Sequence, residues 1–308
     1  MLDKVKQNNI KNILTIMLSQ GANTKANISF LTGLSNTTVS DCINEVQAIN
    51  FVSKTGFEQP RGGRRSAIYQ INRQYGMFLG IAVLKDSIFF TLTDSCGSII
   101  ESFFYEKGKE ARILSIFKGI EKACEMGKIL AIGIGVHGEV DYQNQTLISS
   151  MYDNWSNVPL KELIERRFRI VTYLDNIANH LAVWEKIMGR KHQNFLWANE
   201  EPDIEKLGVI LNGSVLRGQK NMCGQIVKDK ESHSKEAYLA SLQNIAQFLD
   251  VECIILGSDR SCLQEPNETE GVIPIYKVKA GPTETAGAAA VAVQLEWFFS
   301  ILRRAEPN

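Results

Sequence analysis

The sequence lacks the features that mark secreted, membrane-bound and cysteine-stapled proteins. Its six cysteines are scattered and form no C-x-x-C pair, which excludes a readable disulfide framework or four-cysteine zinc site. No apolar run reaches the roughly 18 residues of a membrane span. The polar residues 4–9 are unlike the start of a secretory signal. We therefore expect a cytoplasmic protein with free thiols and no membrane contact.

The chain also lacks net charge, because its 34 Lys and Arg residues match its 34 Asp and Glu residues. The charge is nevertheless unevenly distributed. The first 75 residues hold nine basic and four acidic residues, which leaves 25 and 30 for the rest. A basic module on a slightly acidic body is typical of a protein that meets phosphates at one end only. A length of 308 residues favours two domains, which we place at 1–74 and 75–308.

Three short helices are predicted in the first 50 residues. Apolar residues recur at helical spacing over 5–18, and Gly21 has the character of a helix end. Thr24 is a good cap for a second helix that stops at Gly33, and Ser35 caps a third. The apolar stripe of that third helix is Val39, Ile43, Val46 and Ile49. This order, with a tight Gly-Leu-Ser turn, predicts a helix-turn-helix.

The third helix presents small hydrogen-bonding side chains near its N-terminus, where the base edges of a DNA major groove would be read. The candidate DNA-binding residues are Lys25, Asn36, Thr37, Thr38, Ser40 and Asn44. Taken alone, a plain three-helix bundle with a solvated polar face fits this segment equally well.

An arginine-rich loop follows the third helix. Residues 51–54 and 66–71 are predicted strands, and between them lies Pro-Arg-Gly-Gly-Arg-Arg. Such a loop is usually only solvated surface, but directly after a helix-turn-helix it favours a DNA-binding wing whose arginines enter a minor groove or clamp phosphates. The candidate wing residues are Arg61, Gly62, Gly63, Arg64 and Arg65.

Beyond residue 75 the pattern indicates an α/β architecture. Strands are predicted at 77–83, 88–93, 99–105, 129–136, 170–174 and 207–211, and helices at 112–127, 159–168 and 177–189. The segment 94–97 reads Asp-Ser-Cys-Gly, which predicts a hairpin turn.

Motifs along nearly the whole chain resemble those of the family of repressors, open reading frames and sugar kinases (ROK), in its winged-helix transcriptional repressor branch. The matching segments, in order, are 32–40, 62–65, 133–141 with His137 in place of the usual proline, 154–160, 212–213, 217–218, 254–257 and 287–289. The resemblance implies an actin/hexokinase-like domain of two ribonuclease-H-like lobes. Lobe one would cover about 75–190 plus the C-terminal helix, and lobe two about 191–285.

The same resemblance implies that the kinase machinery is lost. Segment 82–86 reads Ala-Val-Leu-Lys-Asp where family kinases carry Asp-x-Gly-Gly-Thr, and Ile177 occupies the position of the catalytic aspartate. An isoleucine can neither accept a proton nor bind one. Segment 200–206 carries four carboxylates where a glycine-rich phosphate loop is usual, and these would repel a nucleotide. We therefore expect no enzyme activity and no cofactor, with an ATP-dependent sugar kinase as the alternative.

The family's zinc and sugar ligands are also altered. Segment 224–228 reads Gly-Gln-Ile-Val-Lys where the family has Gly-Glu-Ile-Gly-His, and only 25 residues separate Lys228 from Ile254, which resembles a large internal deletion. We expect no bound metal. A pocket for a sugar or sugar-phosphate effector would involve Gly138, Asn176, Gln225 and Lys228. Equally, Gln225 and Lys228 are ordinary surface residues left after the pocket was lost.

These observations predict a sequence-specific transcriptional regulator, a repressor of carbohydrate metabolism genes with a non-catalytic sugar-kinase-like domain. Its partner would be a palindromic double-stranded DNA operator, bound by a homodimer or higher homo-oligomer. A regulator that senses a protein partner, or nothing at all, is a further alternative.

Overall fold

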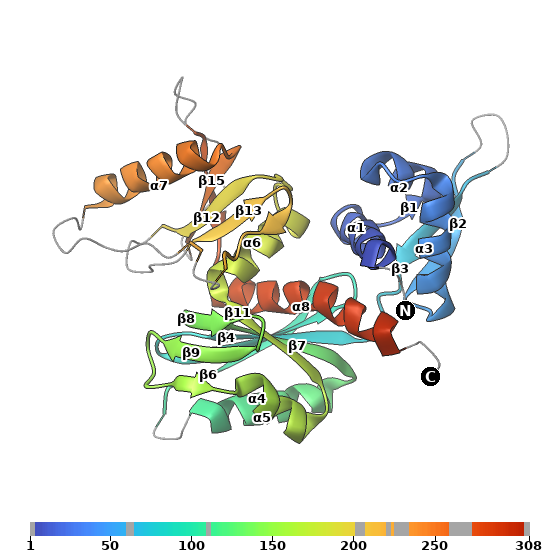
Figure 1. Cartoon of the computed structure of the whole chain (residues 1–308). Helices are drawn as coiled ribbons and strands as arrows, with labels where there is room; N and C mark the ends of the chain where they lie inside the picture. Colours follow the sequence, from blue (N-terminus) through green and yellow to red (C-terminus); the bar gives the residue numbers. More distant parts are fainter. Residues whose placement is uncertain are drawn as a thin grey trace.

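The chain consists of an N-terminal part and two larger α/β lobes (Figure 1). The structure is a computed structural model that describes residues 4–59, 65–108, 112–200, 207–219, 223–224, 234–258 and 273–304. Each lobe is built on a five-stranded sheet, and the long helix α8 (Pro282–Arg304) runs across the first of them (Figure 1). The α/β class expected from the sequence is confirmed.

The N-terminal part contains three helices and a three-stranded antiparallel sheet of order β1-β3-β2. Thr24 caps the second helix by accepting a hydrogen bond from the Asn27 amide at 3.2 Å, and Gly33 ends that helix with φ 69°. Ser35 caps the third by accepting from the Thr38 amide at 3.1 Å. All three expected signals are confirmed. The elements are α1 (Lys4–Gln20), β1 (Asn23–Thr24), α2 (Lys25–Thr32), α3 (Asn36–Ala48), β2 (Val52–Phe57) and β3 (Ala67–Ile71).

Lobe one is a mixed sheet of order β11-β7-β4-β5-β6, with β11, β7 and β4 parallel and β5 and β6 antiparallel. Helices α4 and α5 cover one face through a core of aliphatic side chains (Figure 1). A small sheet of order β10-β9-β8, which the sequence did not predict, lies beside it. The elements are β4 (Met77–Val83), β5 (Ser87–Asp94), β6 (Ile99–Glu106), α4 (Arg112–Met126), β7 (Ile129–Val136), β8 (Gly138–Asp141), β9 (Thr146–Ser150), β10 (Ser156–Val158), α5 (Leu160–Phe168) and β11 (Val171–Asn176).

Lobe two has the strand order β14-β13-β12-β15-β16. Helix α6 falls within the range 75–190 expected for lobe one, but it packs on one face of this second sheet; α7 packs on the other face, and each helix covers its own apolar cluster. The elements are α6 (Ile177–Met188), β12 (Phe195–Asn199), β13 (Gly208–Leu211), β14 (Ser214–Val215), α7 (Lys235–Leu249), β15 (Cys253–Ser258) and β16 (Ile275–Lys279).

Helix α8 lies unusually close to the sheet of lobe one, because glycines on the strands remove the side chains that would separate them. A Cβ atom at Gly80 would lie 1.7 Å from the carbonyl oxygen of Ala286, and one at Gly133 would lie 2.1 Å from that of Ala289. The small residues of α8 therefore rest directly on β4 and β7.

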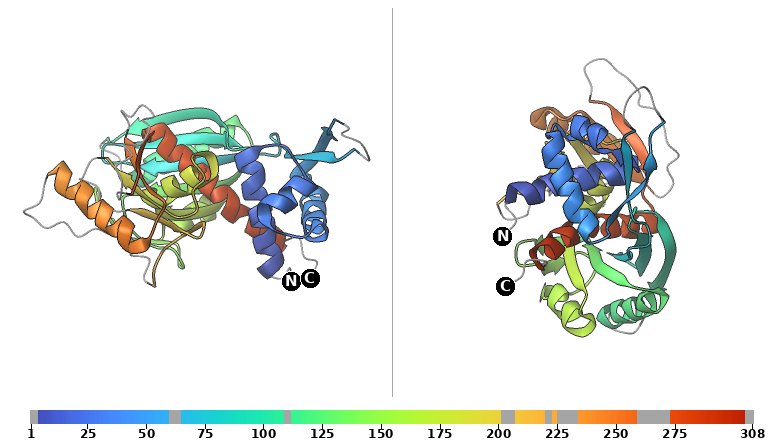
Figure 2. Two further views of the ribbon diagram at one scale, coloured as in Figure 1. Left: turned by 90° about the horizontal axis from the view of Figure 1, so that it is seen from above. Right: turned by 90° about the vertical axis from the view of Figure 1, so that its right-hand side faces the viewer.

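The other end of α8 packs against the N-terminal part, and the two share one apolar cluster. The ring of Phe51 lies 5.7 Å from Trp297, 5.5 Å from Phe298 and 5.2 Å from Tyr75. Both views of Figure 2 show α1–α3 beside the C-terminal half of α8. Among the described residues, no helix is long and apolar enough to cross a membrane.

Candidate nucleic-acid interface and ligand pocket

Helix α3 presents a polar face to solvent beside its buried stripe. Asn36, Thr37 and Asn44 are exposed, and Ser40 is half-buried. The buried stripe is Val39, Cys42, Ile43 and Val46. Thr38 differs from the other candidates, because its hydroxyl lies 2.9 Å from the Ser35 hydroxyl and so belongs to the helix cap.

Lys25 lies beside this face. Its ammonium donates to the Asn44 side-chain oxygen at 3.4 Å and sits 5.1 Å from the centre of the Tyr69 ring. These contacts tie the start of α2 to α3 and place a positive charge next to Asn44. The structure thus brings together two residues that the sequence could only name separately.

The strands that flank the arginine-rich loop pair as expected, with β2 antiparallel to β3. Arg65 is exposed, two positions before β3 begins. The other candidates on this loop, Arg61, Gly62, Gly63 and Arg64, lie outside the described residues.

Two acidic side chains share the α3 surface, and they differ in charge balance. Glu45 forms an ion pair with Lys6 of α1, so its charge is compensated. Asp41 is exposed, and no basic group of the described residues forms an ion pair with it. A free carboxylate on this face would oppose the approach of phosphates.

Two of the candidate effector residues are in direct contact. The Asn176 side-chain amide donates to the Gly138 carbonyl at 3.0 Å, and its oxygen accepts from the Ala178 amide at 2.9 Å, which caps α6. Both ends of the Asn176 side chain are thus hydrogen-bonded within the protein, and the residue is only 3% exposed. Gln225 and Lys228 lie outside the described residues.

The first residue of α6 is Ile177, which is 3% exposed and belongs to the apolar cluster between α6 and the sheet of lobe two. The position that the resemblance assigns to a kinase's catalytic carboxylate is therefore occupied by a buried apolar side chain.

A buried ion pair, Arg112 with Asp153, stabilises the turn between β4 and β5. The Arg112 guanidinium donates to the carbonyls of Leu84 and Lys85 and pairs with the Asp153 carboxylate at 3.1 Å. Both charged side chains are less than a tenth exposed. These hydrogen bonds from Arg112 hold the backbone of the β4–β5 turn in one conformation.

Of the acidic segment 200–206, only Glu200 is described. Its carboxylate pairs with Lys277 at 2.8 Å and with Lys235 at 3.0 Å. These hydrogen bonds lower the pKa of Glu200 to about 2, so it stays ionised. Glu200 therefore links α7 and β16 to the end of β12.

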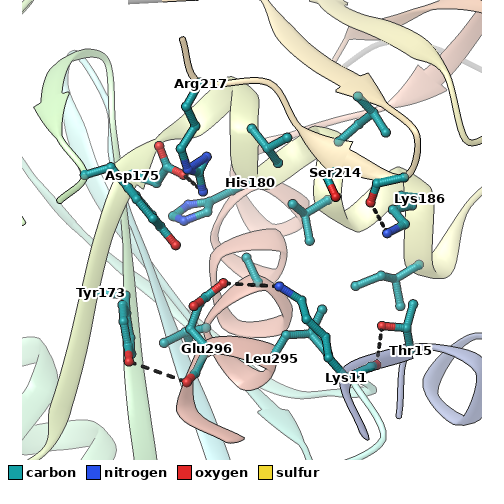
Figure 3. A pocket seen from close by; sticks show the side chains of 18 of the residues that line it. Lys11, Thr15, Tyr173, Asp175, His180, Lys186, Ser214, Arg217, Leu295 and Glu296 are labelled. Carbon is teal, nitrogen blue, oxygen red and sulfur yellow. Dashed lines mark hydrogen bonds and ion pairs between the residues drawn. The ribbon is translucent and has the colours of Figure 1, made fainter. Parts of the chain in front are cut away.

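A cavity of about 630 Å³ lies where α1 meets both lobes (Figure 3). Its walls come from α1, β11, α6, the β13–β14 hairpin and α8. The sequence did not single out this cavity, although Arg217 falls in one of the segments that carry the resemblance. Its volume is within the range of about 300–1,000 Å³ that small-molecule sites occupy.

One wall of this cavity carries a charged cluster. The Arg217 guanidinium lies 2.8 Å from the Asp175 carboxylate and 3.6 Å from the centre of the Tyr142 ring. His180 lies next to them and is 5% exposed, and burial lowers its pKa to about 4, so the imidazole is neutral near pH 7.

The opposite side carries two lysines. The Lys11 ammonium of α1 lies 3.6 Å from the Glu296 carboxylate of α8. Lys186 of α6 donates to the Gly213 carbonyl in the β13–β14 turn. Burial, and then the nearby Lys11 charge, lower the pKa of Lys186.

Comparison with known proteins gives both a family and a fold. Residues 78–227 match the model of the ROK family. The chain is 32% identical to the xylose repressor of Bacillus spizizenii over an alignment of 232 residues. This alignment covers 72% of this chain and 60% of the repressor. The chain is 30% identical over 232 residues to the xylose repressor of Bacillus subtilis, with the same coverage. A glucokinase of Streptomyces coelicolor is 27% identical to this chain over 150 residues. This alignment covers 47% of this chain and 45% of the glucokinase.

Solved structures give the same picture of the fold. A crystal structure described as a ROK family transcriptional regulator, homolog of the E. coli MLC protein, matches 97% of this chain and 99% of its own at a TM-score of 0.71 and 12% identity. A ROK glucokinase from Streptomyces griseus, in complex with glucose and AMPPNP, matches 70% of this chain at a TM-score of 0.55 and 16% identity.

The fold is thus an α/β fold similar to those of ROK regulators and hexokinase-like kinases. Within it, the chain contains a ROK-family domain over residues 78–227. The matched region spans about 60% of the length of the curated repressors.

Proposed function

We propose that this chain is a DNA-binding transcriptional repressor of carbohydrate metabolism genes, in which a winged helix-turn-helix is joined to a non-catalytic sugar-kinase-like domain. In this proposal residues 1–74 form the DNA-binding domain and residues 75–308 the effector and dimerisation domain. Such a protein would act in the cytoplasm as a symmetric oligomer on a palindromic operator.

The observation that carries the proposal is the geometry of α3. Its capped N-terminus follows a tight turn at Gly33, and it leaves Asn36, Thr37 and Asn44 exposed in front of a buried apolar stripe. An exposed helix with hydrogen-bonding side chains at its N-terminal end is the form in which helix-turn-helix proteins read a major groove. The antiparallel pair β2–β3 beside it supports the assignment of residues 60–65 as a wing.

The relatives point the same way. Several of the curated proteins similar to this chain are named xylose repressors. Xylose is therefore the first sugar to test as an effector. In this proposal the effector-binding residues are Gly138, Asn176, Gln225 and Lys228.

The replacements in the kinase machinery support a role without catalysis. Ile177 offers no proton acceptor, and the β4–β5 turn is bound by Arg112 through its carbonyls. Phosphoryl transfer depends on positioned phosphates and a carboxylate that orients the attacking hydroxyl. We infer that the chain neither binds a nucleotide for catalysis nor turns over ATP.

The test is a fluorescence anisotropy titration of the full chain against duplex DNA from the region upstream of its gene. We expect saturable binding that weakens steeply with salt, because phosphate contacts release counterions. Asn44→Ala should weaken specific binding by roughly 1–3 kcal/mol. The matched control is Asn244→Ala on the exposed face of α7, which should bind normally.

Two results would contradict the proposal. One is the same affinity for the upstream duplex as for a scrambled duplex at every salt concentration. The other is steady ADP release when the chain is given ATP and a monosaccharide, which would support the sugar kinase instead.

A further inference from the structure

The hydrogen bond between Lys25 and Asn44 fixes which way the Asn44 side-chain amide points. Asn44 lies on the same line of α3 as Asn36 and Ser40, because residues four apart on a helix lie one above another. The Lys25 ammonium donates to the Oδ1 atom of Asn44 at 3.4 Å. An ammonium has three donors and no acceptor, so the oxygen of this amide faces Lys25 and its NH2 group is turned the other way.

A second contact fixes the position of the Lys25 ammonium. It lies 5.1 Å from the centre of the Tyr69 ring on β3, within the distance at which a cation and an aromatic face attract each other. Strand pairing places that ring, because Tyr69 lies opposite Asn23, two residues before Lys25. One N–H of the ammonium is used by Asn44 and another can face the ring, which leaves a third for an outside acceptor.

The fold itself makes little use of these donors. No carboxylate among the residues that the structure describes lies within ion-pair distance of Lys25. Lys25 is the first residue of α2, where a positive charge opposes the helix dipole. The amide nitrogen of Asn44 donates to no described residue, and this side chain is exposed. Two neighbouring donor groups are therefore free to meet acceptors on a bound molecule.

We propose that Lys25 and Asn44 together read a guanine in the major groove, and that Lys25 sets this preference by orienting the Asn44 amide. The inference rests on the proposed function and adds to it the base that this part of α3 recognises. Guanine presents two acceptors in the major groove, O6 and N7, which suit two donors. Adenine presents N7 beside the N6 amino group, whose hydrogens would face the ammonium. An asparagine without such a neighbour pairs instead with adenine, because it offers one donor and one acceptor.

The test is a selection of duplexes from a randomised DNA pool by the full chain, followed by sequencing of the bound fraction. We expect the unaltered chain to enrich a motif with a guanine at the position where Asn44→Ala loses its base preference. At that position Lys25→Met should lower the enrichment of guanine relative to adenine on the order of tenfold, because the released Asn44 oxygen can accept from N6.

Lys54→Met is the matched control for the loss of charge. Lys54 is exposed on β2, and its ammonium also lies over an aromatic ring, 3.8 Å from the centre of Phe57. Its replacement should weaken binding to all duplexes about equally and leave the motif unchanged. Tyr69→Phe retains the ring and should retain the guanine preference. Tyr69→Leu removes the ring and should reduce that preference, because the ammonium loses its second contact.

A second measurement identifies the acceptor on the base. 7-Deazaguanine lacks the N7 acceptor but still pairs with cytosine. Placed at the enriched guanine, it should weaken binding of the unaltered chain on the order of fivefold, as measured by anisotropy. The double variant Lys25→Met/Asn44→Ala should bind the two duplexes equally, because it lacks both donors.

The outcomes separate this inference from the proposed function. A pool without any enriched motif would remove both. An enriched motif that neither Asn44→Ala nor Lys25→Met alters would overturn this inference alone and leave a sequence-specific DNA-binding protein. The inference would also be wrong if the position that depends on Asn44 were adenine in the unaltered chain, or if Lys54→Met changed the base preference as Lys25→Met does.

Discussion

Phe51 of the N-terminal part and Trp297 of α8 lie in ring contact, 5.7 Å apart between centroids, although 245 positions separate them in the chain. Phe51 is 1% exposed and also contacts Phe298 and Tyr75. This contact is one of the places where the part that carries α3 meets the body, beside the ion pair between Lys11 of α1 and Glu296 of α8.

Phe51→Ala should lower the free energy of unfolding by about 3–5 kcal/mol, because it leaves a cavity among aromatic rings. Urea unfolding followed by circular dichroism measures the change. Phe248→Ala is the matched control, since Phe248 on α7 is 88% exposed and its loss should change stability little. Equal effects of the two substitutions would contradict the packing described for Phe51.

Local signals predicted much of the fold, and distant contacts escaped prediction. The Thr24 and Ser35 caps and the glycine end at Gly33 were readable because each depends on residues within four positions. The small sheet β10-β9-β8 was missed, because its strands are short and carry no clear alternation of apolar residues.

The candidate sites show the same difference between local signals, which the sequence reveals, and distant contacts, which it does not. The sequence named Gly138 and Asn176 as candidate effector residues, and the hydrogen bond between them is a finding of the structure. The cavity that joins Lys11, Lys186 and Glu296 brings together helices from three distant segments. No spacing in the sequence marks such a site, because it depends on how α1 docks on α6 and α8.

Asp41→Asn should strengthen DNA binding if α3 enters a groove. Asp41 is exposed on the polar face of α3, and its negative charge would repel nearby phosphates. We expect the affinity to rise several-fold at low salt and the gain to shrink as salt screens the charge. Anisotropy titrations at two salt concentrations measure this. Asp250→Asn, after α7, is the control, and an unchanged affinity in Asp41→Asn would place α3 away from DNA.

Acid should destabilise the protein through two histidines, the buried His180 and the half-buried His137. Burial lowers the pKa of His180 and of His137 from 6.5 to about 4. Between these values the unfolded chain binds more protons than the folded one, so stability is present above pH 6.5 and is lost as the pH falls toward 4. At pH 5 the loss is roughly 2 kcal/mol for each histidine.

Urea unfolding at pH 7 and pH 5 measures this loss, and His180→Gln should reduce it by about half, whatever its effect at pH 7. The variant His192→Gln is the control, because that imidazole lies at the surface beside Glu252. A pH dependence that His180→Gln leaves unchanged would show that His180 is not buried in its neutral form.

Gly80→Ala tests the close approach of α8 to the sheet of lobe one. The added Cβ would lie 1.7 Å from the Ala286 carbonyl oxygen, so the helix and β4 would have to move apart. We expect a loss of stability of about 3 kcal/mol or more, because overpacking a rigid contact shifts backbone as well as side chains.

Gly287→Ala is the control on α8 itself, where the new Cβ would meet its neighbours at 3.6 Å, an ordinary contact distance. Because alanine favours a helix over glycine by about 1 kcal/mol, Gly287→Ala should leave stability unchanged or raise it. Opposite signs for the two substitutions in one urea titration would establish which surface of α8 lies against β4, and a tolerated Gly80→Ala would rule out the contact.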